Sequence, residues 1–297
     1  MEFSHLLPLV FSLCLSLLLI PLASATRLPP SISYHHGLLL AGNLNLSLLW
    51  YGRFDPLEKT VVRTFVASLT LDRSLSFTPD VMSWWNKVQT YLPSGATVRI
   101  AKETDDESAS AGNVLTQKSL PDLLARATAG EQNTVAVIFA GKDVAIEGTC
   151  QGTCYLHRAL GKQPYIAVGN PEKRCPGKCA VPFHLPDEHF CPPLTLTLEP
   201  PSGNVGADAV IIHFASALAE TVTNPFNSGF FGGEGGKYQA ATACVGLFAS
   251  NALPGFPSNV RVDPHTGGAF NAHGVNNTKF LLPALWDVKT SSCWTPL

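Results

Sequence analysis

Two Cys-x-x-x-Cys pairs are the residues whose type and spacing most directly suggest chemistry. Cys150 and Cys154 form the first pair, Cys175 and Cys179 form the second, and 20 residues separate them. Four thiolates at this spacing could bind a zinc ion, or the cysteines could form disulfides. Disulfides are the favoured interpretation if the chain is exported, because thiols oxidise outside the cell.

Histidines and carboxylates form two further groups with metal-binding or acid–base potential. His184, Asp187 and His189 lie within six residues of one another, and His213 and Glu220 are seven residues apart. Two helical turns span seven residues, so His213 and Glu220 should share one face of a helix. The first group lies in a proline-flanked loop and the second lacks a third partner, so ordinary hydrogen-bonded or solvated positions are favoured over a metal site.

No nucleophile is marked by a motif. The sequence contains neither a G-x-S-x-G elbow nor an H-E-x-x-H helix. The acidic residues Glu103, Asp105, Asp106 and Glu107 are typical of a solvated surface rather than of paired catalytic carboxylates. We therefore predict no catalytic residue and no cofactor.

The tryptophans have two interpretations. Trp50, Trp84 and Trp286 fall within apolar, periodic segments, which predicts that they belong to the core. The alternative is a platform of exposed rings on which sugars stack.

Two N-x-S/T sequons, at Asn45 and Asn276, are candidate N-glycan acceptors. Asn276 is the better candidate, because its surroundings read as a turn, whereas Asn45 lies in a predicted strand.

The amino terminus predicts export. The apolar run from Leu6 to Ile20 is followed by Pro21 and the small residues Ala23-Ser24-Ala25, which is typical of a cleaved signal peptide over residues 1–25. The run is shorter than the ~20 residues that cross a bilayer, and we predict no other membrane span. Cleavage removes Cys14 and leaves seven cysteines, so at least one is unpaired or bonds another molecule.

Composition limits the class of partner. The formal net charge is only −2, which does not favour nucleic acid or anionic lipid. Charged residues make up 14% of the chain, against 24 glycines and 23 prolines, a balance typical of a loop-rich extracellular fold.

Hydrophobic periodicity predicts strands and helices in mixed order. Strands are expected over 43–50, 134–140 and 164–168, helices over 55–69, 79–92, 119–127 and 207–223, and an exposed loop over 102–118. The fold class is α+β or α/β. We predict one mixed-sheet globular domain over 26–297, with helices packed on the sheet and long disulfide-stapled loops.

Several long strings resemble the plant EXORDIUM-like, or phosphate-induced, family from about Tyr34 to the C-terminus. They are "LLWYGRFDPLEKTVVRTF", "SWWNKVQTYL", "VGNPEKRCPGKCAVPFH", "TVTNPFNSGFF" and "NAHGV…KFLLPALWD…SSCW". The resemblance implies a secreted protein of the apoplast or cell wall that promotes cell expansion and brassinosteroid-responsive growth. It implies no established catalytic activity.

The resemblance also bears on the metal and cysteine hypotheses. Some relatives carry His-Glu-Leu-Ala-Glu in the long helix, reminiscent of a zinc-protease helix, where this chain has Ser216-Ala217-Leu218-Ala219-Glu220. A zinc ligand and a general base are thus missing, which argues against a metallopeptidase.

The family set has six cysteines, so Cys191 is the candidate unpaired thiol. Six cysteines allow 15 pairings. Proximity in the sequence favours Cys150 with Cys154 and Cys175 with Cys179, which leaves Cys244 with Cys293.

The sequence therefore predicts a non-enzymatic extracellular growth factor that binds a cell-wall or cell-surface partner. The alternatives are a wall-polysaccharide-binding module and a degenerate, zincin-like, metal-dependent hydrolase.

Overall fold

A computed structural model describes residues 31–70, 77–131, 133–187, 197–250 and 259–297. The predicted signal peptide, His189 and Cys191 lie outside these ranges, and their roles stay predictions.

The main sheet has five strands in the order β3-β2-β5-β8-β7. Four of them are parallel: β2 (Gly42–Tyr51), β3 (Ala96–Asp106), β5 (Thr134–Ala140) and β8 (Gln163–Gly169). The fifth, β7 (Tyr155–Leu160), forms an antiparallel hairpin with β8. The predicted class, a mixed sheet with packed helices, is therefore confirmed.

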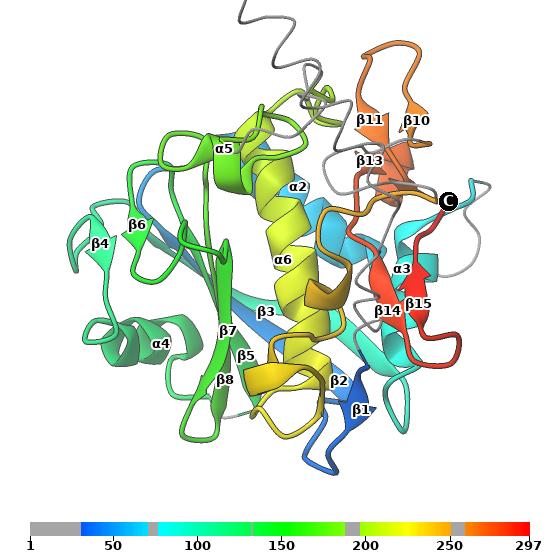
Figure 1. Cartoon of the computed structure of the whole chain (residues 1–297). Coiled ribbons are helices and arrows are strands. Elements are labelled where there is room, and N and C mark those ends of the chain that lie inside the picture. The colour runs from blue at the N-terminus through cyan, green and yellow to red at the C-terminus, as the bar shows by residue number, and fades with distance from the viewer. Residues whose placement is uncertain (1–30, 71–76, 132, 188–196, 251–258) are drawn as a thin grey trace, which may run out of the picture.

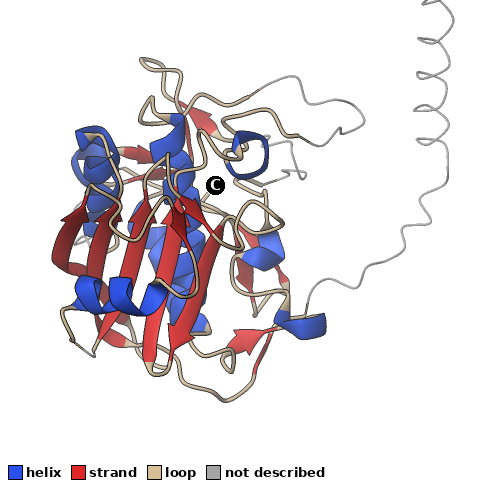
Figure 2. Ribbon diagram, turned by 90° about the vertical axis from the view of Figure 1, so that its left-hand side faces the viewer, coloured by secondary structure: helices blue, strands red, loops and turns tan. Residues whose placement is uncertain are grey.

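Helices cover both faces of this sheet (Figure 1). One face packs against α2 (Pro56–Ser68), α3 (Val81–Gln89) and α6 (Val205–Thr223), and the other packs against α4 (Leu120–Thr128). In Figure 2 the strands are seen face-on, with α4 in front of the sheet and the longer helices behind it. The short α5 (Pro176–Cys179) lies beyond the end of β8.

Further short elements lie around the main sheet. The strands form two-stranded pairs: β1 (Ser33–Tyr34) with β9 (Phe230–Phe231), β4 (Val114–Leu115) with β6 (Ala145–Ile146), β10 (Arg261–Val262) with β11 (Ala269–Phe270), β12 (Ala272–His273) with β13 (Lys279–Phe280), and β14 (Leu285–Asp287) with β15 (Ser292–Trp294). The 3₁₀ helices are η1 (Glu234–Gly236), η2 (Thr242–Cys244) and η3 (Val275–Asn277).

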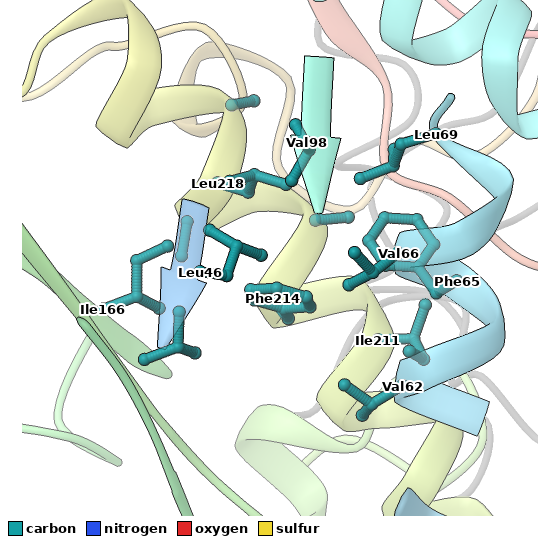
Figure 3. Packing of buried hydrophobic residues seen from close by; sticks show 14 of the residues in the cluster. Leu46, Val62, Phe65, Val66, Leu69, Val98, Ile166, Ile211, Phe214 and Leu218 are labelled. Atoms are coloured by element: carbon teal, nitrogen blue, oxygen red, sulfur yellow. The ribbon is translucent and has the colours of Figure 1, made fainter. Parts of the chain in front are cut away.

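The larger core lies between the sheet and the helices α2, α3 and α6 (Figure 3). Phe65 of α2 is fully buried at its centre, with its ring edge-on to those of Phe214 and Phe280 at 5.8 and 5.7 Å. Edge-to-face aromatic pairs are favourable beyond the area that they bury. This core fixes α2 and α6 against the strands that carry the candidate site.

Helix α6 is apolar on nearly all sides because it is enclosed by protein. By length and composition it could cross a membrane, but 94% of its most apolar window is buried within the fold. A helix that is hydrophobic all round can equally be a buried core helix, and this is the position that α6 occupies.

Two details of the predicted elements were wrong. The segment 102–118 is not wholly a loop, because β3 continues to Asp106. Its alternating polar and apolar side chains suit an edge strand whose exposed side chains pair with α2, where Arg63 contacts Glu103. The helix predicted over 79–92 begins at Val81, and its N-cap is Asp80, whose carboxylate accepts the Ser83 amide at 2.6 Å.

The six candidate cysteines form three disulfides, but two of the three predicted pairs were wrong. Cys150 bonds Cys175 and Cys154 bonds Cys179, and only Cys244–Cys293 follows the prediction. In the chain, 25 residues separate the partners of each of the first two bridges. The reason is that the segment holding the first Cys-x-x-x-Cys pair lies beside α5, so each of its cysteines meets one cysteine of the second pair.

Candidate functional site

The helical connections on the two sides of the boundary between β2 and β5 cover opposite faces of the sheet. The chain passes from β2 to β3 through α2 and α3 on one face, and from β3 to β5 through α4 on the other. At such a point the loops that follow the two strands diverge, and open α/β sheets bind ligands in the crevice outside the carboxyl ends of the strands.

A polar cleft of about 430 Å³ lies at this point. It is formed by residues that directly follow β2, β3 and β5, together with the first turn of α2. The lining residues are Arg53, Phe54, Asp55, Glu58, Glu107, Lys142 and Asp143. Its volume falls in the range of natural small-ligand sites.

A buried carboxylate joins the cleft to the strands below. Glu58 is only 6% exposed, and its Oε2 accepts the Asp55 amide at 2.7 Å. Its Oε1 accepts a hydrogen bond of 2.6 Å from Nδ2 of Asn170, which directly follows β8. Burial raises the pKa of Glu58 above its usual value. The carboxyl ends of β2 and β8 are thereby fixed to one side chain.

Close approach of α6 holds Asn170 in place. A Cβ at Gly206, in the first turn of α6, would lie 2.4 Å from Nδ2 of Asn170. Only glycine fits here without displacing the amide that binds Glu58.

The rim of the cleft carries charges of both signs that do not pair with one another. Asp143 binds Lys173 at 2.8 Å. In the part of the chain that the structure describes, the side chains of Arg53, Lys142, Asp55 and Glu107 form no ion pair. Arg53, Lys142 and Glu107 are therefore open to a ligand, whereas the Asp55 carboxylate also takes part in the capping box of α2. Phe54 adds an apolar surface. This set suits a small organic ligand that has an acidic group and several hydrogen-bond donors.

A second cavity, of about 200 Å³, lies farther along the same edge of the sheet. It is lined by residues that follow β5 and β8 and by all four cysteines of the first two bridges.

Among the described residues, the predicted metal candidates do not form one ligand group. His184 is exposed, with Nδ1 2.8 Å from the Leu185 carbonyl oxygen, and the Asp187 amide donates to Gly177 at 2.9 Å. Nε2 of His213 donates to the Cys179 carbonyl oxygen at 2.6 Å. Burial lowers the pKa of His213 to about 4, so its ring is neutral at pH 7.

Glu220 is buried and belongs to a different polar cluster, whose other members are partly buried. Tyr155 donates its hydroxyl to Oε2 at 2.8 Å, Nε2 of His157 lies 3.4 Å from the same oxygen, and the Thr242 amide donates to Oε1 at 2.8 Å. Tyr155 also lies beside His213, with ring centroids 6.2 Å apart, so His213 and Glu220 do share one helix face as predicted.

Potential metal ligands gather only at the cysteines in the described chain. Two groups have three or more ligand atoms within 4.8 Å of one another: Cys150, Cys175 and Cys179, and Cys154, Cys179 and His213. Neither contains His184, Asp187 or Glu220, and the sulfurs are already used in disulfides.

The interpretation of the tryptophans as core residues is confirmed. Trp50, Trp84, Trp85 and Trp286 are at most 4% exposed, and none of them can act as a sugar platform. Trp294 is partly buried, and Lys87 covers its ring at 5.4 Å.

Asn276 lies in an exposed turn, whereas Asn45 lies in β2 and accepts a hydrogen bond from Arg99 at 2.7 Å. Glycosylation at either position stays a prediction.

Sequence reasoning missed the cleft because its residues form no motif. Arg53 and Asp55 follow one predicted strand, Lys142 and Asp143 follow another, and Asn170 follows a third. The common position directly after buried strands was the signal that could have found them.

Comparison with known proteins identifies the family. A family model described as the phosphate-induced protein 1 conserved region matches residues 32–296. Protein EXORDIUM of Arabidopsis thaliana is 38% identical over 97% of this chain and 98% of its own length. Protein EXORDIUM-like 2 of the same plant is 38% identical over 90% of each chain, and Protein PHOSPHATE-INDUCED 1 of Nicotiana tabacum is 37% identical over 89% and 88%. The chain therefore belongs to the EXORDIUM (phosphate-induced protein 1) family, as the sequence resemblance predicted.

Proposed function

We propose that this protein is exported to the apoplast or cell wall of a plant, where it promotes or regulates cell expansion by binding a partner. Membership of the EXORDIUM family supports a growth-related role in plants. The proposal adds export, a link to brassinosteroid-responsive growth, and binding rather than catalysis as the mode of action.

The disulfides support export. Three bridges lie within the described chain, and such bonds persist mainly in oxidising compartments. Together with the predicted signal peptide over 1–25, they favour a mature chain that begins near Thr26. Determination of the amino terminus of protein collected from the wall fluid tests this step. A start near Thr26 supports it, and an intact Met1 contradicts it.

The unpaired charges of the cleft are the observation that carries binding. Arg53 and Lys142 lie with Asp55 and Glu107 around one cavity at the carboxyl edge of the sheet, and none of the four forms an ion pair with another described residue. A ligand that satisfies them gains charge-assisted hydrogen bonds from both signs of charge.

A growth assay with matched variants tests the proposal. Purified residues 26–297 are added to elongating plant tissue, and cell length is measured. The wild type is expected to increase it, and the double variant Arg53→Gln, Lys142→Gln is expected to lose the effect. The control is Lys162→Gln, Lys289→Gln, which removes two exposed cations away from the cleft and should keep full effect. Equal effects of both double variants would show that the cleft is not the binding site.

A wall-polysaccharide-binding module is the second candidate, because Phe54 beside carboxylates can bind the apolar and hydroxyl faces of a sugar. This candidate predicts that the protein is retained on pectin, xyloglucan or cellulose columns and that the Phe54→Ala variant is not retained.

The metal-dependent hydrolase is the third candidate. Metal analysis of protein folded without added zinc tests it, and fewer than one ion per chain would exclude it.

A further inference from the structure

The two disulfides at α5 lie next to each other. The sulfurs of Cys150, Cys175 and Cys179 are all within 4.8 Å of one another, so a sulfur of one bridge lies close to the other bridge. A thiolate released from the first bridge would need little movement to reach the second.

The second cavity, of about 200 Å³, opens onto these sulfurs. Its lining includes all four cysteines, the apolar residues Val144 and Ile146, and the exposed cation Arg174. A small thiol can therefore approach both bridges from one space. The Arg174 guanidinium favours a thiol that carries a carboxylate, and it also favours a thiolate in the cavity.

The third disulfide offers an internal comparison. In each of the three bridges one cysteine is buried and its partner is partly exposed, as with Cys244 and Cys293. Exposure alone thus predicts similar reactivity for all three. Among the described residues, however, no third sulfur or histidine lies within 4.8 Å of the Cys244–Cys293 pair, and neither cysteine lines the cavity.

We propose that the cavity beside α5 is a thiol–disulfide exchange site for a small anionic thiol. The thiolate attacks Sγ of Cys150, forms a mixed disulfide there, and releases Cys175 as a thiolate. Cys175 then attacks Sγ of Cys179, forms a Cys175–Cys179 bond, and releases Cys154 as a thiolate.

A third step regenerates the small thiol. Cys154 attacks Sγ of Cys150, forms Cys150–Cys154, and releases the original thiolate. Each step forms one S–S bond and breaks one, so the sequence needs no net oxidant or reductant. The product has the two local Cys-x-x-x-Cys pairs, and the segment 150–154 is no longer tied to α5. This activity is independent of the proposed growth function.

Peptide mapping after exposure to glutathione tests the proposal on the folded wild-type chain, residues 26–297. Glutathione carries two carboxylates and is the anionic probe. Aliquots are quenched with acid, alkylated, digested and analysed by mass spectrometry. Glutathione on Cys150, followed by Cys150–Cys154 and Cys175–Cys179 linkages with Cys244–Cys293 intact, is the expected result. Unchanged linkages, or loss of Cys244–Cys293 at the same rate, would overturn the proposal.

Two charge variants test the role of the cavity. Arg174→Gln should slow exchange with glutathione about fivefold, the effect of one nearby charge in water, and should slow exchange with 2-mercaptoethanol less, because both attack as thiolates but only glutathione also carries carboxylates. The matched control Lys178→Gln removes an exposed cation of α5 that does not line the cavity and should leave both rates unchanged. Equal slowing by both variants would contradict an anionic-thiol site.

Discussion

The core around Phe65 and the carboxyl edge of the sheet differ in how completely their groups are satisfied. In the core, aromatic and aliphatic side chains contact one another on all sides, and Phe65, Phe214 and Phe280 are fully buried. At the edge, Arg53 and Lys142 share a cavity with carboxylates and form no ion pair within the described chain. The core determines stability, whereas the edge carries the charges on which the proposed binding function depends.

The largest expected effect lies in the core. Phe65→Ala should lower the free energy of unfolding by about 3–5 kcal/mol, because it leaves a cavity among three aromatic rings. Denaturant titration measures this change. The control Phe77→Ala, at a ring that is 47% exposed, should change it by less than about 1 kcal/mol. Similar losses in both variants would contradict the assigned core.

Low pH should weaken the fold through His213. Its pKa is about 4 in the folded chain and about 6.5 when unfolded, so the unfolded state binds the proton first as the pH falls. The contribution of His213 to the free energy of unfolding should therefore fall between pH 6.5 and 4, by at most about 3 kcal/mol, and this contribution should level off below pH 4. Denaturant titrations across this range are compared with His213→Asn, which should show a shallower dependence. Identical pH profiles would contradict a neutral, buried His213.

Loss of the Glu58 carboxylate should have an intermediate effect. Glu58→Ala leaves the Asp55 amide and the Asn170 side chain without their acceptor, which costs about 1–3 kcal/mol of stability. Glu58→Gln retains one acceptor oxygen and should cost less. Thermal unfolding of the two variants measures the difference, and an unchanged midpoint for Glu58→Ala would show that the carboxylate does not join the strand ends.

The smallest effect on stability is expected at the rim. Arg53→Gln, Lys142→Gln should change the free energy of unfolding by no more than about 0.5 kcal/mol, because neither cation has a partner to lose. The same titration used for Phe65→Ala measures it. A large loss would mean that these cations stabilise the fold, and the contrast between core and edge would fail.

Hydrophobic pattern was a reliable guide wherever a segment is buried on one face or on both. The strand 134–140 and the helix 207–223 were predicted to within two residues of β5 and α6, because their apolar residues match the period of each structure. The edge strand β3 and the hairpin strand β7 were missed in whole or in part. Their alternating, partly polar sequences resemble loops, and their position depends on neighbouring strands.

The candidate site was less predictable than the fold. His157 and Tyr155 were not considered as partners of Glu220, since they lie on β7, more than 60 residues earlier in the chain. Of the residues that line the cleft, only Glu107 was named from the sequence, as part of a solvated acidic surface. No local pattern distinguishes Arg53 or Lys142 from any exposed cation.

The sequence by itself determined the main elements and the burial of Trp50 and Trp84, because these depend on residue type and local period. Its resemblance to a family indicated the family itself and which six cysteines pair. Only the tertiary structure decided the partners in the first two disulfides and the gathering of charges at the carboxyl edge. Both depend on where the crossover connections place segments that are distant in the sequence. The free energy that brings those segments together comes from contacts throughout the core, so no single sequence motif predicts it.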